Sequence, residues 1–109
     1  MTRYCLTLNL KNDPILIQQY EEHHKAVWPE IIESIKDAGI VGMQIYRYET
    51  RLIMLMEVAD SFNFENKVAA DSKNSKVQEW ERLMWNYQEA LPGVAKGEKW
   101  MLMNKIFEL

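Results

Sequence analysis

Hydrophobic residues in the first part of the chain follow two different periods. In residues 3–10, RYCLTLNL, every second residue from Tyr4 to Leu10 is apolar, and this period of two predicts a strand. Asp13 and Pro14 then predict a helix start, because Asp can accept a backbone N–H at an N-cap and Pro suits the first helical position. Spacings of three and four continue to Gly39, which should end the helix. The residues on this stripe are Leu16, Tyr20, His24, Val27, Ile31, Ile35 and Ala38.

The middle of the chain predicts a β-hairpin. Residues 40–48 and 51–58 are rich in strand-forming side chains, and only Glu49-Thr50 separates them. Residues 52–58, LIMLMEV, are apolar at nearly every position. Such a strand is expected to have both of its faces covered.

The last third predicts two helices and a strand. Asp60-Ser61 should open a short helix over 62–70, and Ser75 with Gln78 forms a capping-box pattern that should start a helix reaching about residue 90. Leu91-Pro92-Gly93 ends that helix, residues 94–99 read as a loop, and residues 100–107 as a final strand.

This order of elements is β-α-β-β-α-β with a divided second helix. It predicts an α+β, ferredoxin-like fold over a single domain, residues 1–109, with a four-stranded antiparallel sheet and its helices on one face. Such a layer leaves the second sheet face bare. Because the strand at 51–58 is apolar on both faces, we expect a second copy of the chain to cover it, as in a homodimer.

Composition narrows the class of protein. The 109 residues are 48% hydrophobic and 27% charged, as in ordinary globular domains. A net charge of −3 argues against nucleic acid or an anionic membrane as partner. No apolar run approaches the roughly 20 residues that span a bilayer. A single cysteine, Cys5, and no signal peptide favour a cytoplasmic location.

The candidate chemistry begins with two adjacent histidines in QYEEHHKAVWPEI. His24 lies on the apolar stripe with Tyr20 one turn before it and Trp28 one turn after, whereas His23 is displaced toward the charged flank and is expected at the surface. Adjacent helical residues diverge by about 100°, so the pair should not bind one metal. His24 is therefore either a packed core histidine or a titrating imidazole at a pocket wall.

Two further features bear on that choice. Pro29 either opens the turn after His24 to a ligand or simply begins a second helical segment. On the later helix, Trp80 is followed by Glu81, and an aromatic face beside a carboxylate can bind a sugar. The alternative for Trp80 is core packing.

Together these residues resemble the L-rhamnose/L-fucose mutarotases, a family of small dimeric α+β barrels. The resemblance spans essentially the whole chain. It rests on the Tyr20-x-x-x-His24-x-x-x-Trp28-Pro29-Glu30 block, the hairpin around Gln44-Ile45-Tyr46, Gln78-x-Trp80, and the C-terminal strand. It implies interconversion of the α and β anomers of a 6-deoxy hexose without a cofactor or metal. It also implies that His24 is the proton donor and that Tyr20, Trp28 and Trp80 belong to the sugar site.

The chain departs from the rhamnose pattern at two positions of that site. Glu81 stands where the family has a second aromatic, and Met43 where it has a pocket tyrosine. The segments WERLMW and GEKWMLM are more similar to the L-fucose branch, so L-fucose is the expected substrate and L-rhamnose the alternative. Other activities on this fold remain as alternatives: a cofactor-free monooxygenase, a haem-handling barrel, or a non-catalytic sugar-binding module.

Overall fold

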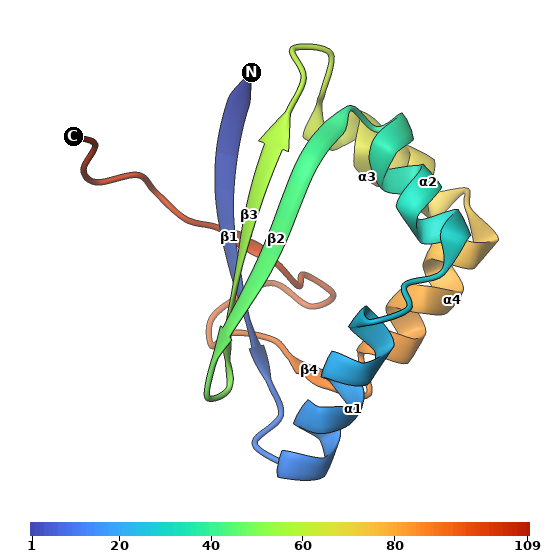
Figure 1. Ribbon diagram of the computed structural model, residues 1–109, viewed down its shortest axis with the longest axis vertical. Helices are drawn as coiled ribbons and strands as arrows, with labels where there is room; N and C mark the ends of the chain where they lie inside the picture. The colour runs from blue at the N-terminus through green and yellow to red at the C-terminus, as the bar shows by residue number, and fades with distance from the viewer.

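The computed structural model describes residues 1–109 as an antiparallel sheet with four helices arched over one of its faces (Figure 1). The elements, in order, are β1 Thr2–Leu10, α1 Pro14–His24, α2 Pro29–Asp37, β2 Ile40–Tyr48, β3 Arg51–Val58, α3 Phe64–Ser72, α4 Ser75–Met84, β4 Gln88–Glu89 and β5 Met101–Leu102. The α+β class, the antiparallel sheet and the placement of the helices on one side are as predicted. None of the helices is long and apolar enough to cross a membrane.

The sheet has the order β2-β3-β1, and both β4 and β5 pair with the remaining edge of β1. The hairpin predicted around Glu49-Thr50 is present as β2 and β3. The register of β1 on β3 pairs Leu6 with Met54 and Leu8 with Leu52, so these side chains share the face under the helices.

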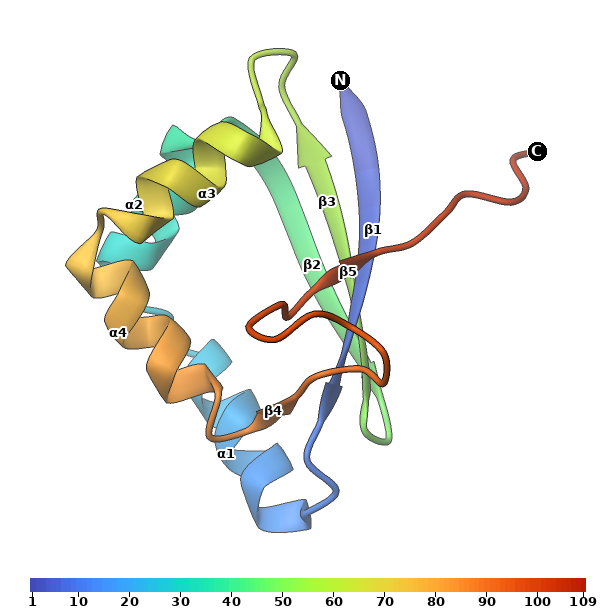
Figure 2. The ribbon, with the colours of Figure 1, turned by 180° about the vertical axis from the view of Figure 1, so that it is seen from behind.

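The predicted final strand over 100–107 is largely wrong. Only Met101 and Leu102 pair with β1, at Thr7 and Leu6, whereas β4 pairs with Asn9 and Leu10 farther along the same edge. Asn104 and Lys105, which are residue types disfavoured in strands, follow the paired residues. After Met103, whose N–H donates to the carbonyl of Cys5 at 2.8 Å, the chain leaves the sheet, as Figure 2 shows. Two short strands thus occupy the place of the single fourth strand that the sequence predicted.

The stripe over 14–38 divides into two helices, with a break directly after His24. Pro29 is the first residue of α2, which decides between the two interpretations of this proline. A proline ring disfavours helical geometry in the preceding residue, and Trp28 accordingly has a ψ of 137°. Gly39, with a φ of +95°, follows the end of α2 as predicted.

The predicted starts of the later helices are wrong by a few residues. Helix α3 begins after Asn63, whose side chain accepts the N–H of Asn66, rather than after Asp60-Ser61. Helix α4 begins after Asn74, whose Oδ1 accepts two backbone N–H groups, so Ser75 is inside the helix and not its cap. Helix α4 also ends at Met84 rather than near residue 90.

The apolar core lies between the helices and the sheet in two groups. The larger contains Leu10, Tyr20, Ile31, Leu52, Val77, Trp80, Met84 and Tyr87. The smaller contains Leu6, Ile40, Met56 and Val58. The candidate site lies in the space between these two groups of side chains, under the helices.

Candidate functional site

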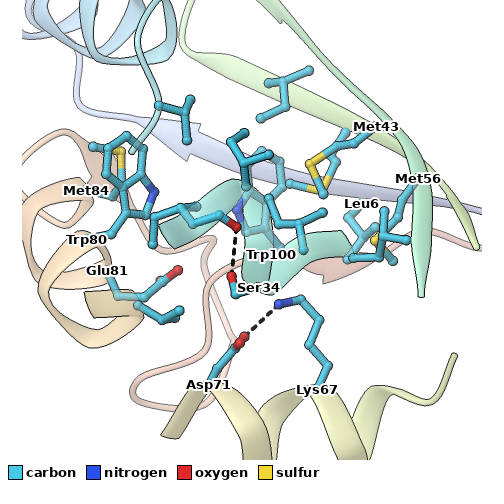
Figure 3. A pocket seen from close by; sticks show the side chains of 18 of the residues that line it. Leu6, Ser34, Met43, Met56, Lys67, Asp71, Trp80, Glu81, Met84 and Trp100 are labelled. Atoms are coloured by element: carbon cyan, nitrogen blue, oxygen red, sulfur yellow. Dashed lines mark hydrogen bonds and ion pairs between the residues drawn. The ribbon is translucent and has the colours of Figure 1, made fainter. Parts of the chain in front are cut away.

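A cavity of about 720 Å³ lies between the sheet and the helices (Figure 3). Its wall is mostly hydrophobic with a few polar groups, which is the usual make-up of a small-molecule site. The predicted residues that line it are Tyr20, His24, Met43, Trp80 and Glu81. Trp28 does not line it but packs edge-on against Trp80, with ring centroids 5.1 Å apart.

His24 closes helix α1 and presents one free ring nitrogen. Its Nδ1 lies 2.9 Å from the carbonyl oxygen of Tyr20. Because a carbonyl can only accept, Nδ1 carries the proton of the neutral ring and Nε2 keeps its lone pair. Burial lowers the pKa of His24; the Tyr20 carbonyl opposes this, and the nearby His23 lowers the pKa further. At neutral pH, Nε2 is therefore a proton acceptor.

Tyr20 lies beside this imidazole, with ring centroids 4.3 Å apart. Burial raises the pKa of Tyr20 to about 12, although a hydrogen bond from Gln88 lowers it and the charge of Glu81 raises it. Nε2 of Gln88 donates to the Tyr20 hydroxyl over 3.4 Å. The phenol consequently stays protonated and can donate a hydrogen bond to a ligand.

The prediction that His23 is a surface residue is wrong. The ring is half-buried, and its Nε2 lies 3.0 Å from the hydroxyl of Tyr87. It also meets Trp80 edge-on, at 6.4 Å between centroids, while His24 meets the same indole at 5.8 Å. Tyr87 follows the end of α4 and covers the flank of α1, a contact that periodicity within α1 cannot indicate.

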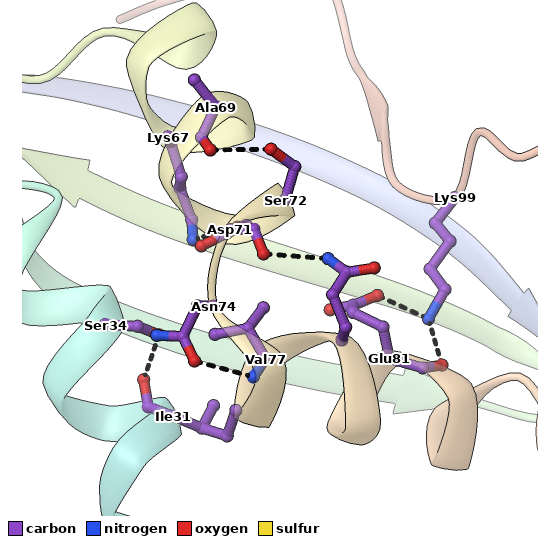
Figure 4. Close-up of polar contacts among 11 residues, drawn as sticks. Ile31, Ser34, Lys67, Ala69, Asp71, Ser72, Asn74, Val77, Glu81 and Lys99 are labelled. Carbon is purple, nitrogen blue, oxygen red and sulfur yellow. Dashed lines mark hydrogen bonds and ion pairs between the residues drawn. The ribbon is translucent and has the colours of Figure 1, made fainter.

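Glu81 is bound by a lysine that sequence reasoning missed. Nζ of Lys99 lies 2.6 Å from Oε2 of Glu81 and donates to the Glu81 carbonyl at 3.0 Å (Figure 4). The same ammonium lies 4.6 Å from the centroid of the Trp85 ring. Burial lowers the pKa of Lys99, which Glu81 opposes, and the lysine side chain is only 10% exposed. No donor contacts the other carboxylate oxygen, Oε1.

Several further lining residues that the sequence did not indicate have polar or aromatic side chains. Trp100 reaches the cavity from the residue before β5, and Gln88 reaches it from β4. At the far end, Lys67 and Asp71 of α3 form an ion pair of 2.8 Å (Figures 3 and 4). No spacing in the sequence marks Trp100 or Gln88 as cavity residues, because the other residues of the wall near them belong to distant elements.

Comparisons with known sequences point to one family. The family model described as L-rhamnose mutarotase matches residues 3–109. An L-fucose mutarotase of Xanthomonas campestris pv. campestris is 45% identical over 111 residues, which cover 100% of this chain and 89% of the relative. An L-rhamnose mutarotase of Sinorhizobium fredii is 28% identical over 88 residues, which cover 80% of this chain and 76% of the relative.

Solved structures agree on the fold. The crystal structure of an L-rhamnose mutarotase from Formosa agariphila matches with a TM-score of 0.75 and 19% identity, covering 100% of this chain and 99% of the other. Tetracenomycin F2 cyclase from Streptomyces glaucescens matches with a TM-score of 0.60 and 14% identity, so the architecture alone does not specify the chemistry. Because the family model and the 45% identical relative each match essentially the whole chain, this chain belongs to the L-rhamnose mutarotase family.

Proposed function

We propose that this chain is a cofactor-independent isomerase that interconverts the α and β anomers of L-fucose in the cavity beside His24. The observation that carries the proposal is the free Nε2 of a mostly buried, neutral imidazole at a wall that also holds Trp80 and Glu81. Similarity along the whole chain to an L-fucose mutarotase supports this sugar over L-rhamnose.

The imidazole can carry both proton transfers of the reaction. Nε2 of His24 takes the proton of the anomeric hydroxyl O1, and the C1–O5 bond breaks as C1 becomes an aldehyde. The departing ring oxygen O5 then takes the proton from the imidazolium, which is the donor role expected of His24. After rotation about C1–C2, the same steps in reverse close the ring on the other face. Because O1 and O5 are bonded to one carbon, a single nitrogen can serve both.

The remaining residues bind and orient the sugar. The indole of Trp80 stacks on its C–H groups, the Tyr20 phenol donates to a hydroxyl, and Oε1 of Glu81 accepts from another. Met43 contributes an apolar wall for the methyl group of a 6-deoxy sugar. Trp28 acts indirectly, by supporting the edge of Trp80. Glu81 is the contact that distinguishes L-fucose from L-rhamnose, whose hydroxyl stereochemistry differs.

A homodimer is part of the proposal. The sheet face away from the helices has no covering element, and it exposes Tyr46 (56%), Tyr48 (79%) and Met103 (42%). The C-terminal residues Ile106 and Phe107 are exposed as well. A second copy packed on this face would bury these side chains, as the apolar pattern of β3 requires. The free thiol of Cys5 fits a reducing, cytoplasmic environment.

The direct test is NMR exchange spectroscopy of L-fucose at anomeric equilibrium, with and without the protein. We expect catalytic amounts to accelerate exchange of L-fucose more than exchange of L-rhamnose. Equal acceleration of both would contradict the assignment of the sugar. L-fucose binding without acceleration would make the protein a sugar-binding module instead of an enzyme.

A further inference from the structure

Gln88 contains the one buried side-chain polar atom that has no hydrogen-bond partner, Oε1. The residue is 4% exposed, and its Nε2 already donates to the Tyr20 hydroxyl. Gln88 opens β4 opposite Leu10, a position at which the neighbouring core is apolar. An unpaired buried acceptor destabilises the free protein, so packing does not explain an amide here.

The unpaired oxygen belongs to a side chain that lines the cavity together with Tyr20 and His24. Because Nε2 of Gln88 donates to the Tyr20 oxygen, the phenol proton is left for a ligand. Oε1 itself has almost no accessible surface, so the amide must turn slightly toward the cavity to meet a ligand. With that turn, the two side chains offer one donor, the Tyr20 hydroxyl, and one acceptor, Oε1 of Gln88. A sugar hydroxyl can accept the first and donate to the second.

We propose that Gln88 is a sugar-binding residue that accepts a hydrogen bond from one hydroxyl of the substrate, next to the contact made by Tyr20. This inference rests on the proposed function and deepens it. Gln88 and Tyr20 hold the sugar on the His24 side of the cavity, whereas Glu81 contacts it from α4. A sugar that lacks the matching hydroxyl would leave the amide buried and unpaired, which is a strong basis for discrimination.

The test compares Gln88→Met, which keeps the length of the side chain and removes both polar atoms, with wild type. For L-fucose we expect kcat/KM to fall about tenfold or more, as for loss of a buried hydrogen bond to substrate. The Tm of the free variant should equal or exceed that of wild type, because an unpaired acceptor has been removed. Gln18→Met, on the exposed side of α1, is the matched control and should change neither quantity.

Monodeoxy analogues of L-fucose identify the contacted hydroxyl. For one analogue, the kcat/KM of wild type should fall, relative to L-fucose, by the same factor by which Gln88→Met lowers kcat/KM for L-fucose. The Gln88→Met variant should have the same kcat/KM for that analogue as for L-fucose. The inference is overturned if Gln88→Met leaves kcat/KM within twofold of wild type. It is also overturned if the variant loses activity and Tm together, since the amide would then support the fold.

A wrong assignment of the enzymatic function would give a different experimental result from a wrong assignment of Gln88. If wild type accelerates exchange of no sugar, the enzyme assignment is wrong, and saturation-transfer NMR binding of L-fucose to wild type and Gln88→Met still tests the contact. Weaker binding by the variant supports the role of Gln88, and equal binding overturns it.

Discussion

The adjacent histidines differ in what their ring nitrogens contact. His24 uses Nδ1 on the carbonyl of Tyr20 and keeps Nε2 free, whereas His23 uses Nε2 on the hydroxyl of Tyr87. The first arrangement leaves a proton acceptor at the cavity wall. The His23–Tyr87 hydrogen bond links the end of α1 to the segment after α4, and the His23 ring also packs edge-on against the indole of Trp80. We therefore expect His24 to act in the reaction and His23 to act on stability and on the position of Trp80.

His24→Gln should reduce kcat for L-fucose by about 10² to 10⁴, the usual contribution of a general acid–base group. The variant should keep the far-UV circular dichroism of wild type. NMR anomeric exchange at saturating sugar measures the effect. A loss of less than tenfold in a folded variant would show that another group carries the proton.

The activity should also depend on pH through His24. Protonation of Nε2 removes the acceptor, and burial lowers the pKa of this group below its ordinary value of about 6.5, so kcat/KM should stay level near pH 7 and fall at lower pH. As pH falls below about 6.5, the unfolded chain binds this proton before the folded chain does, so His24 should also reduce stability in acid. Tm measured between pH 7 and 5 should therefore drop less for His24→Gln than for wild type.

His23→Ala should lower the free energy of unfolding by about 1 kcal/mol or more, because the Tyr87 hydroxyl loses its partner and Trp80 loses a contact. Urea denaturation measures this, and Tyr87→Phe should reproduce the hydrogen-bond part of the loss. Unchanged stability in His23→Ala would contradict the placement of His23 against the core.

At the scale of elements, two irregular segments shape the site. The break at residues 25–28 follows from Pro29 and ends α1 at His24, whose imidazole Nδ1 lies 2.9 Å from the Tyr20 carbonyl oxygen. The segment from Ala90 to Lys99 joins β4 to β5 and is held to α4 through Lys99. Neither segment adds a polar side chain to the cavity wall itself: His24 stands at the end of α1, just before the first, and Lys99 of the second acts on the lining residue Glu81.

Lys99→Met should raise KM for L-fucose several-fold with a smaller change in kcat. The ammonium holds Oε2 of Glu81 and leaves Oε1 for the sugar, so its loss frees the carboxylate to move. Lys99→Arg should retain most of the affinity, and Lys96→Met, at an exposed position of the same loop, is the control. Equal KM values in wild type and Lys99→Met would show that Glu81 needs no such support.

At the scale of the whole molecule, one layer of helices covers one face of the sheet and the other face is open. Alternation along β3 directs Leu52 and Met56 under the helices and Leu55 to the open face, where Leu55 pairs with Cys5 and Gln44. An apolar residue in the middle of an exposed sheet face is unfavourable in an isolated chain. The proposed dimer accounts for it.

Light scattering after size exclusion should therefore give the mass of two chains for wild type. Leu55→Glu should shift that mass toward one chain, because it places a charge in the middle of the interface. Gln18→Glu, a charge added on the exposed side of α1, should leave the mass unchanged. A monomeric wild type would contradict the proposed assembly.

Local patterns were sufficient for the long elements. The alternation in 3–10 and the hairpin at 40–58 are confirmed as β1 and β2–β3, because each is governed by neighbours in sequence. The single helix predicted over 14–38 is helical at both ends but divides into α1 and α2. The helix starts at Asn63 and Asn74 were missed by a few residues, since several nearby polar residues compete to be the cap. The final strand was overestimated because Asn104 and Lys105, residue types disfavoured in strands, follow the two residues that pair with β1.

The sequence by itself determined the fold class, the stripe that carries Tyr20 and His24, and the membership of the family. Only the tertiary structure decided that His23 turns inward to Tyr87, that Lys99 binds Glu81, and that Gln88 is buried with an unpaired oxygen. The partners in these three contacts, counting Tyr20 for Gln88, are 64, 18 and 68 residues apart. Periodicity reports on contacts within one helix or strand, whereas these contacts exist only after separate elements have packed together.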